Sequence, residues 1–189
     1  YKEYVAGLTA LNAFNTAEAL ARFRRAIQLD STFALAHFKL SIVLGWTEAG
    51  DPAARTHAEA ASRLSASLPA RERALIAGQL AMAQEDYPRA CDVYGALVRN
   101  DSADVEALYG LGECNFHDDV VLPVGGDSAR LAFRSNWNTT LRVNRRILEF
   151  DPTYHLAFQH VQDALTAGAR TGCRPVAGQS RCGEGRTPL

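Results

Sequence analysis

The amino-acid sequence predicts an all-α protein built from repeated pairs of antiparallel helices. A corner that begins with aspartate and leads into a helical phrase occurs three times, starting at Asp30, Asp101 and Asp151. Apolar residues in these phrases recur three and four positions apart, which is the spacing of one helix face. Self-similarity at a period of a few tens of residues is typical of stacked repeats. We therefore expect an α-solenoid, in which each helix pair packs on the next.

The composition narrows the class of protein. The chain has 189 residues, of which 47% are hydrophobic and 22% charged, and this suits one elongated helical domain. Its formal net charge of -1 lacks the basic excess of nucleic-acid-binding proteins, so nucleic acid is not an expected partner. No apolar run of about 18 residues is present, so we expect no membrane segment within this sequence.

The first two helix pairs are predicted from spacing and caps. Residues 1–12 form the first helix, because apolar side chains lie on one face at Tyr4, Leu8 and Leu11. Asn15 and Thr16 offer a cap for the second helix. The second pair is expected at 32–46 and 52–64, with Pro52 at the first position of its helix.

The next helices follow the same plan. Residues 71–84 form a helix, and Asp86 opens another one immediately before Tyr87 and Pro88. In the helix that follows the Asp101 corner, one face carries Leu108, Leu111 and Gly112. The small Gly112 is expected to let a second helix approach closely.

An insertion interrupts the fourth pair at residues 118–137. It contains Pro123, Gly125 and Gly126, and it does not supply a partner helix at the usual distance. We expect a short helix at 128–133, with Asn138 capping the true partner helix at 139–150 and Trp137 filling the junction.

One more helix is expected at 153–167, where it caps the open end of the stack. The domain therefore spans 1–167. Residues 168–189 are mostly Gly, Arg, Pro, Ser and Thr, and we expect this tail to be disordered.

The second helices resemble those of the tetratricopeptide repeat (TPR), whose pattern there is A-x3-F-x2-A. The matching triplets are Ala19, Phe23 and Ala26; Ala54, Ala58 and Ala61; Ala90, Tyr94 and Leu97; and Thr140, Asn144 and Ile147. The resemblance implies a right-handed α-solenoid of about four pairs plus a terminal capping helix. The phrases that start at Asp30 and Leu68 also resemble the repeat region that follows the kinase domain in some bacterial serine/threonine protein kinases.

The same resemblance implies a partner-binding groove on the concave face. The groove positions are Tyr4, Leu8, Phe38, Ile42, Trp46, Leu75, Gln79, Met82, Tyr109, Glu113 and Phe116, although Phe38 and Trp46 are equally compatible with packing between repeats. Tyr109 is the expected main anchor, with its ring free to face the groove. Clamps that bind a C-terminal carboxylate need several cations, and Lys39 stands nearly alone on the inner helices.

These features favour a non-catalytic scaffold that binds a protein or peptide partner, with no cofactor and no metal. No phosphate-binding loop, nucleophile elbow or zinc-protease motif is present. An RNA-binding repeat module is an alternative that the near-neutral charge disfavours. An enzyme with a site in the insertion is a further alternative, motivated by His117, Asp118 and Asp119.

Four cysteines remain to be placed. Cys91 and Cys114 occupy small-residue positions on helices and are expected to be buried free thiols. Cys173 and Cys182 either stay reduced or close a short loop in an oxidising compartment. The chain starts within a helical pattern, so we expect a fragment that is cytoplasmic by default, or extracytoplasmic if a membrane kinase precedes it.

Overall fold

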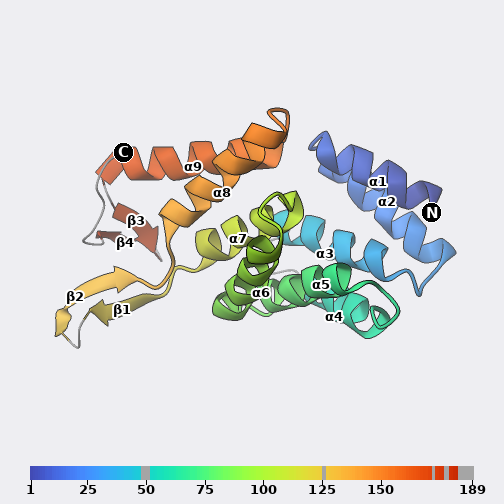
Figure 1. The fold of residues 1–189 in the computed structure, drawn as a ribbon, viewed down its shortest axis with the longest axis horizontal. Coiled ribbons are helices and arrows are strands. Elements are labelled where there is room, and N and C mark those ends of the chain that lie inside the picture. Colours follow the sequence, from blue (N-terminus) through green and yellow to red (C-terminus); the bar gives the residue numbers. More distant parts are fainter. Residues whose placement is uncertain (48–51, 125–126, 172, 177–178, 183–189) are drawn as a thin grey trace.

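The computed structural model describes residues 1–47, 52–124, 127–171, 173–176 and 179–182. Figure 1 shows successive helical hairpins stacked along the chain, with α1 and α2 at one end of the array and α8 and α9 at the other. The helices are α1 (Lys2–Asn12), α2 (Thr16–Leu29), α3 (Ala34–Thr47), α4 (Pro52–Leu64), α5 (Ala70–Ala83), α6 (Tyr87–Asn100), α7 (Val105–His117), α8 (Trp137–Phe150) and α9 (His155–Thr171). The predicted all-α solenoid of four pairs and a terminal helix is confirmed.

The repeated aspartate corners make the same turn each time. Asp30, Asp101 and Asp151 each follow a second helix, and each accepts a hydrogen bond at 2.9 Å from the backbone N–H two residues later. An aspartate side chain that bonds its own backbone in this way stabilises a turn. Helix starts are capped as well, because Asn15, Asp86 and Asp104 accept bonds from N–H groups in the first turns of α2, α6 and α7.

Paired helices approach closely where glycine faces an aromatic ring. The ring of Tyr94 on α6 lies against Gly78 of α5 and Gly110 of α7, and Phe23 of α2 lies against Gly7 of α1 in the same manner. A Cβ atom added to Gly78 would lie 2.6 Å from the Tyr94 ring. Gly112 likewise faces Asn144 of α8, which agrees with its predicted role. The second-helix triplets therefore form the cores of the hairpins.

The insertion forms a β-hairpin, so the helix predicted at 128–133 is wrong. Strand β1 (Val121–Val124) pairs antiparallel with β2 (Asp127–Phe133). Val121, Pro123 and Val124 favour extended backbone in β1, and pairing with β1 keeps 128–133 extended although these residues include no β-branched side chain. Arg134 closes the base of the hairpin, because its guanidinium donates to both carboxylate oxygens of Asp118 at 2.7 and 3.0 Å.

The helix after the insertion begins two residues earlier than predicted. Asn136, not Asn138, is the cap of α8, and its side chain accepts a hydrogen bond from the Asn138 N–H at 3.1 Å. The Trp137 ring stacks on Phe116 at 5.5 Å between centroids, so it does pack at the junction.

Helix α9 continues to Thr171, past its predicted end at residue 167. Strands β3 (Cys173–Val176) and β4 (Gln179–Cys182) follow as an antiparallel pair, in which the Cα atoms of Cys173 and Cys182 are register partners. The rest of the tail that was predicted to be disordered lies outside the described residues. The state of these two thiols stays a prediction.

The prediction that Cys91 and Cys114 are free thiols is wrong, because they form a disulfide between α6 and α7 with a Cα–Cα distance of 5.5 Å. An antiparallel hairpin brings together positions that are equidistant from its turn. The two cysteines are equidistant from the corner at Ser102 and Ala103. In the chain-entropy account, closing a loop of this length stabilises the fold by about 3 kcal/mol.

Among the described residues, no helix is both long enough and apolar enough to cross a membrane.

Two glycine-to-alanine changes test the packing. Gly110→Ala should lower the free energy of unfolding by about 1 to 3 kcal/mol, because the added methyl group meets the Tyr94 ring. Gly45→Ala is the control, since Gly45 is also helical but, apart from its own stretch of helix, has no described atom within 4 Å of an added Cβ. It should stabilise the fold by up to about 1 kcal/mol through helix propensity. Equal urea midpoints for the two variants would contradict the close approach.

Candidate functional site

A groove of about 470 Å³ opens between the first helices of the second, third and fourth pairs. We call it the inner groove. Its walls come mainly from α3, α5 and α7, with further residues from α1, α4, α6 and α9. Its apolar and aromatic lining residues include Phe38, Ile42, Trp46, Leu75, Met82, Tyr87, Tyr94, Tyr109 and Tyr154.

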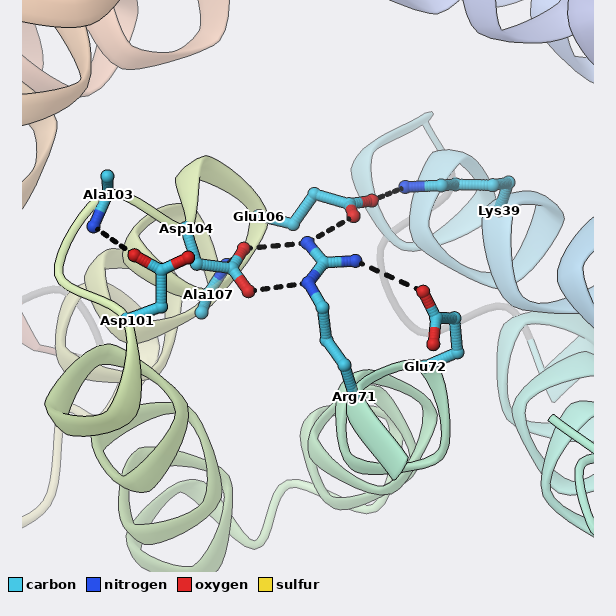
Figure 2. A network of polar contacts seen from close by, with 8 residues as sticks. All are labelled: Lys39, Arg71, Glu72, Asp101, Ala103, Asp104, Glu106 and Ala107. Atoms are coloured by element: carbon cyan, nitrogen blue, oxygen red, sulfur yellow. Dashed lines mark hydrogen bonds and ion pairs between the residues drawn. The ribbon is translucent and has the colours of Figure 1, made fainter. Parts of the chain in front are cut away.

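An ion-pair network crosses one side of the groove and joins three inner helices (Figure 2). Arg71 of α5 donates from Nε and Nη2 to the two carboxylate oxygens of Asp104, both at 2.7 Å. Its Nη2 also bonds Glu106 of α7 at 2.9 Å, and Glu106 in turn pairs with Lys39 of α3. We call these four residues the cross-groove network.

Asp104 has two roles in this network. It caps α7 by accepting the Ala107 N–H at 3.1 Å, and it binds Arg71 at the same time. Its side chain is only 3% exposed, so the carboxylate depends on these donors in place of water. The local start of α7 and the position of α5 are therefore coupled through one side chain.

The network lowers the pKa of both carboxyl groups. Burial alone would raise the pKa of Asp104, but hydrogen bonds from Arg71 and Ala107 bring it below the ordinary value. Burial also acts to raise the pKa of Glu106, and the charge and hydrogen bond of Lys39, together with Arg71, lower it. Both groups are therefore ionised in the folded protein at neutral pH.

A second set of contacts crosses the groove through Glu113 of α7. The Trp46 Nε1–H of α3 points to Glu113 Oε2 at 3.4 Å, and His160 of α9 pairs with Oε1. His117 Nε2 lies 3.6 Å from Oε2 on the same helix. Four groups from three helices thus meet around the Glu113 carboxylate, and three of them, Trp46, Glu113 and His117, line the groove.

The charges around Glu113 are complementary. Burial would raise the pKa of Glu113, but hydrogen bonds and charges of His117 and His160 lower it well below its ordinary value. Burial alone would lower the pKa of His160, but the hydrogen bond and the charge of Glu113 raise it above its ordinary value. The pair is therefore stabilised as a carboxylate and an imidazolium.

Eight of the predicted groove residues line the inner groove: Phe38, Ile42, Trp46, Leu75, Gln79, Met82, Tyr109 and Glu113. Gln79 donates from Nε2 to Ser41 Oγ at 3.0 Å, which fixes its amide. Whether these residues contact a partner stays a prediction.

Three predicted groove residues lie elsewhere. The Tyr4 ring packs between Phe23 and Phe33, at centroid distances of 5.9 and 4.9 Å, and Leu8 packs against the same cluster. Phe116 stacks on Trp137 at the junction with α8. These positions were carried over from a regular repeat, and here they face neighbouring helices.

Tyr109 was expected to present a free ring, and this is wrong. It is 8% exposed, its ring contacts Trp46 and Tyr154, and its hydroxyl lies 3.0 Å from His160 Nε2. Tyr109 therefore supports the base of the groove. Among the predicted groove residues that line it, the partly exposed side chains are Ile42, Trp46, Gln79 and Met82.

Sequence reasoning did not find Glu85, Tyr87 or the cross-groove network as parts of the groove. Glu85 and Tyr87 lie at the turn between α5 and α6, a position that the repeat pattern leaves unassigned. A left-handed φ of 60° at Glu85 marks this turn in the backbone. The ion pair between Lys39 and Glu106 could not be predicted from the sequence, because it depends on how the array curves.

The candidate polar site in the insertion does not form a metal centre. Asp118 is engaged by Arg134, and His117 faces Glu113 and the Tyr87 ring. Across the residues that the structure describes, no group of three or more His, Cys, Asp or Glu side chains is arranged to hold a metal ion.

The chain matches no family model and no curated protein. Among solved structures it is similar to YrrB, described as a TPR protein with an unusual peptide-binding site. The two chains are 18% identical, and the match covers 89% of this chain and 77% of that one with a TM-score of 0.41. The repeat fold of the present chain rests on its own helix pairs.

The cross-groove network predicts a pH-dependent stability. Arg71→Met should lower the free energy of unfolding at pH 7 by about 1 to 2 kcal/mol, a figure that allows for the 43% exposure of the Arg71 side chain. The folded pKa values of Asp104 and Glu106 are lowered, so the contribution is complete above the unfolded values near pH 4 and is lost below them. The difference between parent and variant should therefore shrink as the pH falls below about 4.

Urea unfolding across this pH range measures the effect. Arg55→Met is the control, because Arg55 pairs only with Glu59 in the described structure and its side chain is 58% exposed. Its effect should stay within about 0.5 kcal/mol at every pH. A pH-independent loss in Arg71→Met would contradict the ionic origin of the stabilisation.

Proposed function

We propose that this chain is a non-catalytic interaction scaffold that binds a segment of a partner protein in the inner groove. The observation that carries the proposal is the groove itself, a cavity of about 470 Å³ lined by side chains of the first helices. Grooves between helices commonly bind extended or helical peptide segments through apolar anchors. The groove is large enough for one or two side chains of a ligand.

The residues that line the groove favour an apolar ligand, because they combine a rigid base with partly exposed apolar side chains. Tyr109, Glu113 and Phe38 are almost fully buried and fixed by their own contacts. Ile42, Trp46 and Met82 are only partly buried, and they offer apolar surface toward the groove. A rigid base reduces the entropy that must be lost on binding, which favours affinity.

The proposal extends to the protein of which the scaffold is a part and to its compartment. We propose that the scaffold adjoins a bacterial signalling kinase, which rests on the resemblance of the Asp30 and Leu68 phrases. The Cys91–Cys114 disulfide supports an oxidising compartment, because disulfides persist there and are rare in the cytosol. A sensor region that lies outside the cytoplasm and belongs to a membrane kinase agrees with both the resemblance and the disulfide.

Peptide selection tests the proposal. The folded chain is used to enrich binders from a displayed random-peptide library, and the affinity of synthetic binders is then measured by fluorescence anisotropy. The double variant Ile42→Ala, Met82→Ala should weaken binding by about tenfold or more, because side chains at the centre of an interface often contribute about 2 kcal/mol.

The matched control removes exposed apolar side chains outside the groove. Val5 is 42% and Leu165 44% exposed, and neither lines the groove. Val5→Ala, Leu165→Ala should leave the affinity unchanged, and circular dichroism establishes that both variants are folded. If the two double variants bind every selected peptide equally, the groove is not the binding site.

A further inference from the structure

The cations of the inner groove are already neutralised by the protein. Lys39 is paired with Glu106, and its side chain is 11% exposed. Arg55 donates from Nε to Glu59 Oε1 at 3.1 Å. Neither lysine nor arginine in the described groove is therefore left to attract an anionic ligand.

One end of the groove carries a carboxylate that no described cation neutralises, and a second such carboxylate follows the end of α7. Glu85 lines the groove at the turn between α5 and α6, is exposed, and makes no ion pair within the described structure. Asp119 does not itself line the groove, but it lies two residues after His117, which does. It is exposed and likewise has no described ion pair, whereas its neighbour Asp118 is bound by Arg134. We call Glu85 and Asp119 the acidic rim.

Aromatic rings lie beside the acidic rim. Tyr87 lines the groove next to Glu85, and its ring stacks with that of His117 at a centroid distance of 6.4 Å. Burial raises the pKa of the Tyr87 hydroxyl, and the charges of Glu85, Asp119 and Asp118 raise it further, so both rim carboxylates act on this ring. Carboxylates next to an aromatic face are a favourable setting for a lysine or arginine side chain.

We infer that the inner groove binds a basic, apolar segment of a partner protein. An apolar side chain of the segment packs on Ile42 and Met82, and a lysine or arginine beside it pairs with Glu85 and Asp119 over the Tyr87 ring. This inference rests on the proposed function and adds the charge of the partner. The charge complementarity of the rim is what selects this occupant.

The same charges disfavour other occupants. An acidic segment or a nucleic-acid backbone would bring its negative charge next to Glu85 and Asp119 and meet no free cation in the described groove. A C-terminal carboxylate has the same difficulty, because Lys39 and Arg55 are engaged. Like charges placed together at an interface suppress such partners.

The experiment uses four fluorescein-labelled peptides with blocked ends. Three are synthetic sequences of about twelve residues. The first combines leucine and phenylalanine with lysine, the second replaces lysine by glutamate, and the third replaces leucine and phenylalanine by serine. The fourth has the sequence of residues 168–189 with serine in place of cysteine, because that segment contains four arginines and one glutamate.

The first peptide should bind at least about tenfold more tightly than the others, and its affinity should fall as salt is raised. Glu85→Gln, Asp119→Asn should weaken it by about threefold or more, which is the size expected for two exposed charge pairs. The control Asp92→Asn, Glu149→Gln removes the same net charge from exposed carboxylates that are not among the charges acting on Tyr87, and it should change the affinity by less than about twofold.

The possible results separate the two proposals. Equal binding of the lysine and glutamate peptides, or equal affinity for the rim and control variants, would overturn the basic-segment inference and leave the groove as a binding site. Tightest binding of the 168–189 peptide would overturn the partner assignment in favour of the chain's own segment. Failure of all four peptides, together with failure of the library selection, would overturn the proposed function itself.

Discussion

The carboxylate of Glu106 receives Lys39 from α3 and Arg71 from α5, and the arrangement of the array depends on this junction. In a solenoid each repeat normally contacts only its neighbours. Here an ion pair joins residues 67 positions apart, across the inner side of the third helix pair. The network therefore links the second pair directly to the fourth on the groove side of the stack.

This constraint explains why the inner groove has a rigid base and a limited free surface. The Trp46–Glu113 and Trp46–Tyr109 contacts cross the same space, and His160 adds α9 to them. Buried ionic groups are costly unless they are paired, so these contacts favour one arrangement of the helices. The remaining apolar side chains and the acidic rim are what a ligand can reach.

The features that could be predicted from the sequence are local ones. The Asp30 corner, the Asn15 cap and the triplet around Phe23 each follow from spacing and side-chain chemistry. The burial of Tyr109 could not be predicted, because it depends on whether α3 and α9 curve back toward α7. The Cys91–Cys114 disulfide was predictable in principle, since the two residues are equidistant from one corner. Helical periodicity does not reveal it, because the periodicity of one helix says nothing about which residue of the next helix lies opposite.

A double-mutant cycle on Lys39→Met and Glu106→Gln tests the cross-groove link most directly. The account predicts that the two changes are coupled in the free energy of unfolding by about 0.5 kcal/mol or more, because each removes the same ion pair between α3 and α7. Effects that add to within about 0.3 kcal/mol, with both single variants folded, would show that the second and fourth pairs are not held together by this contact.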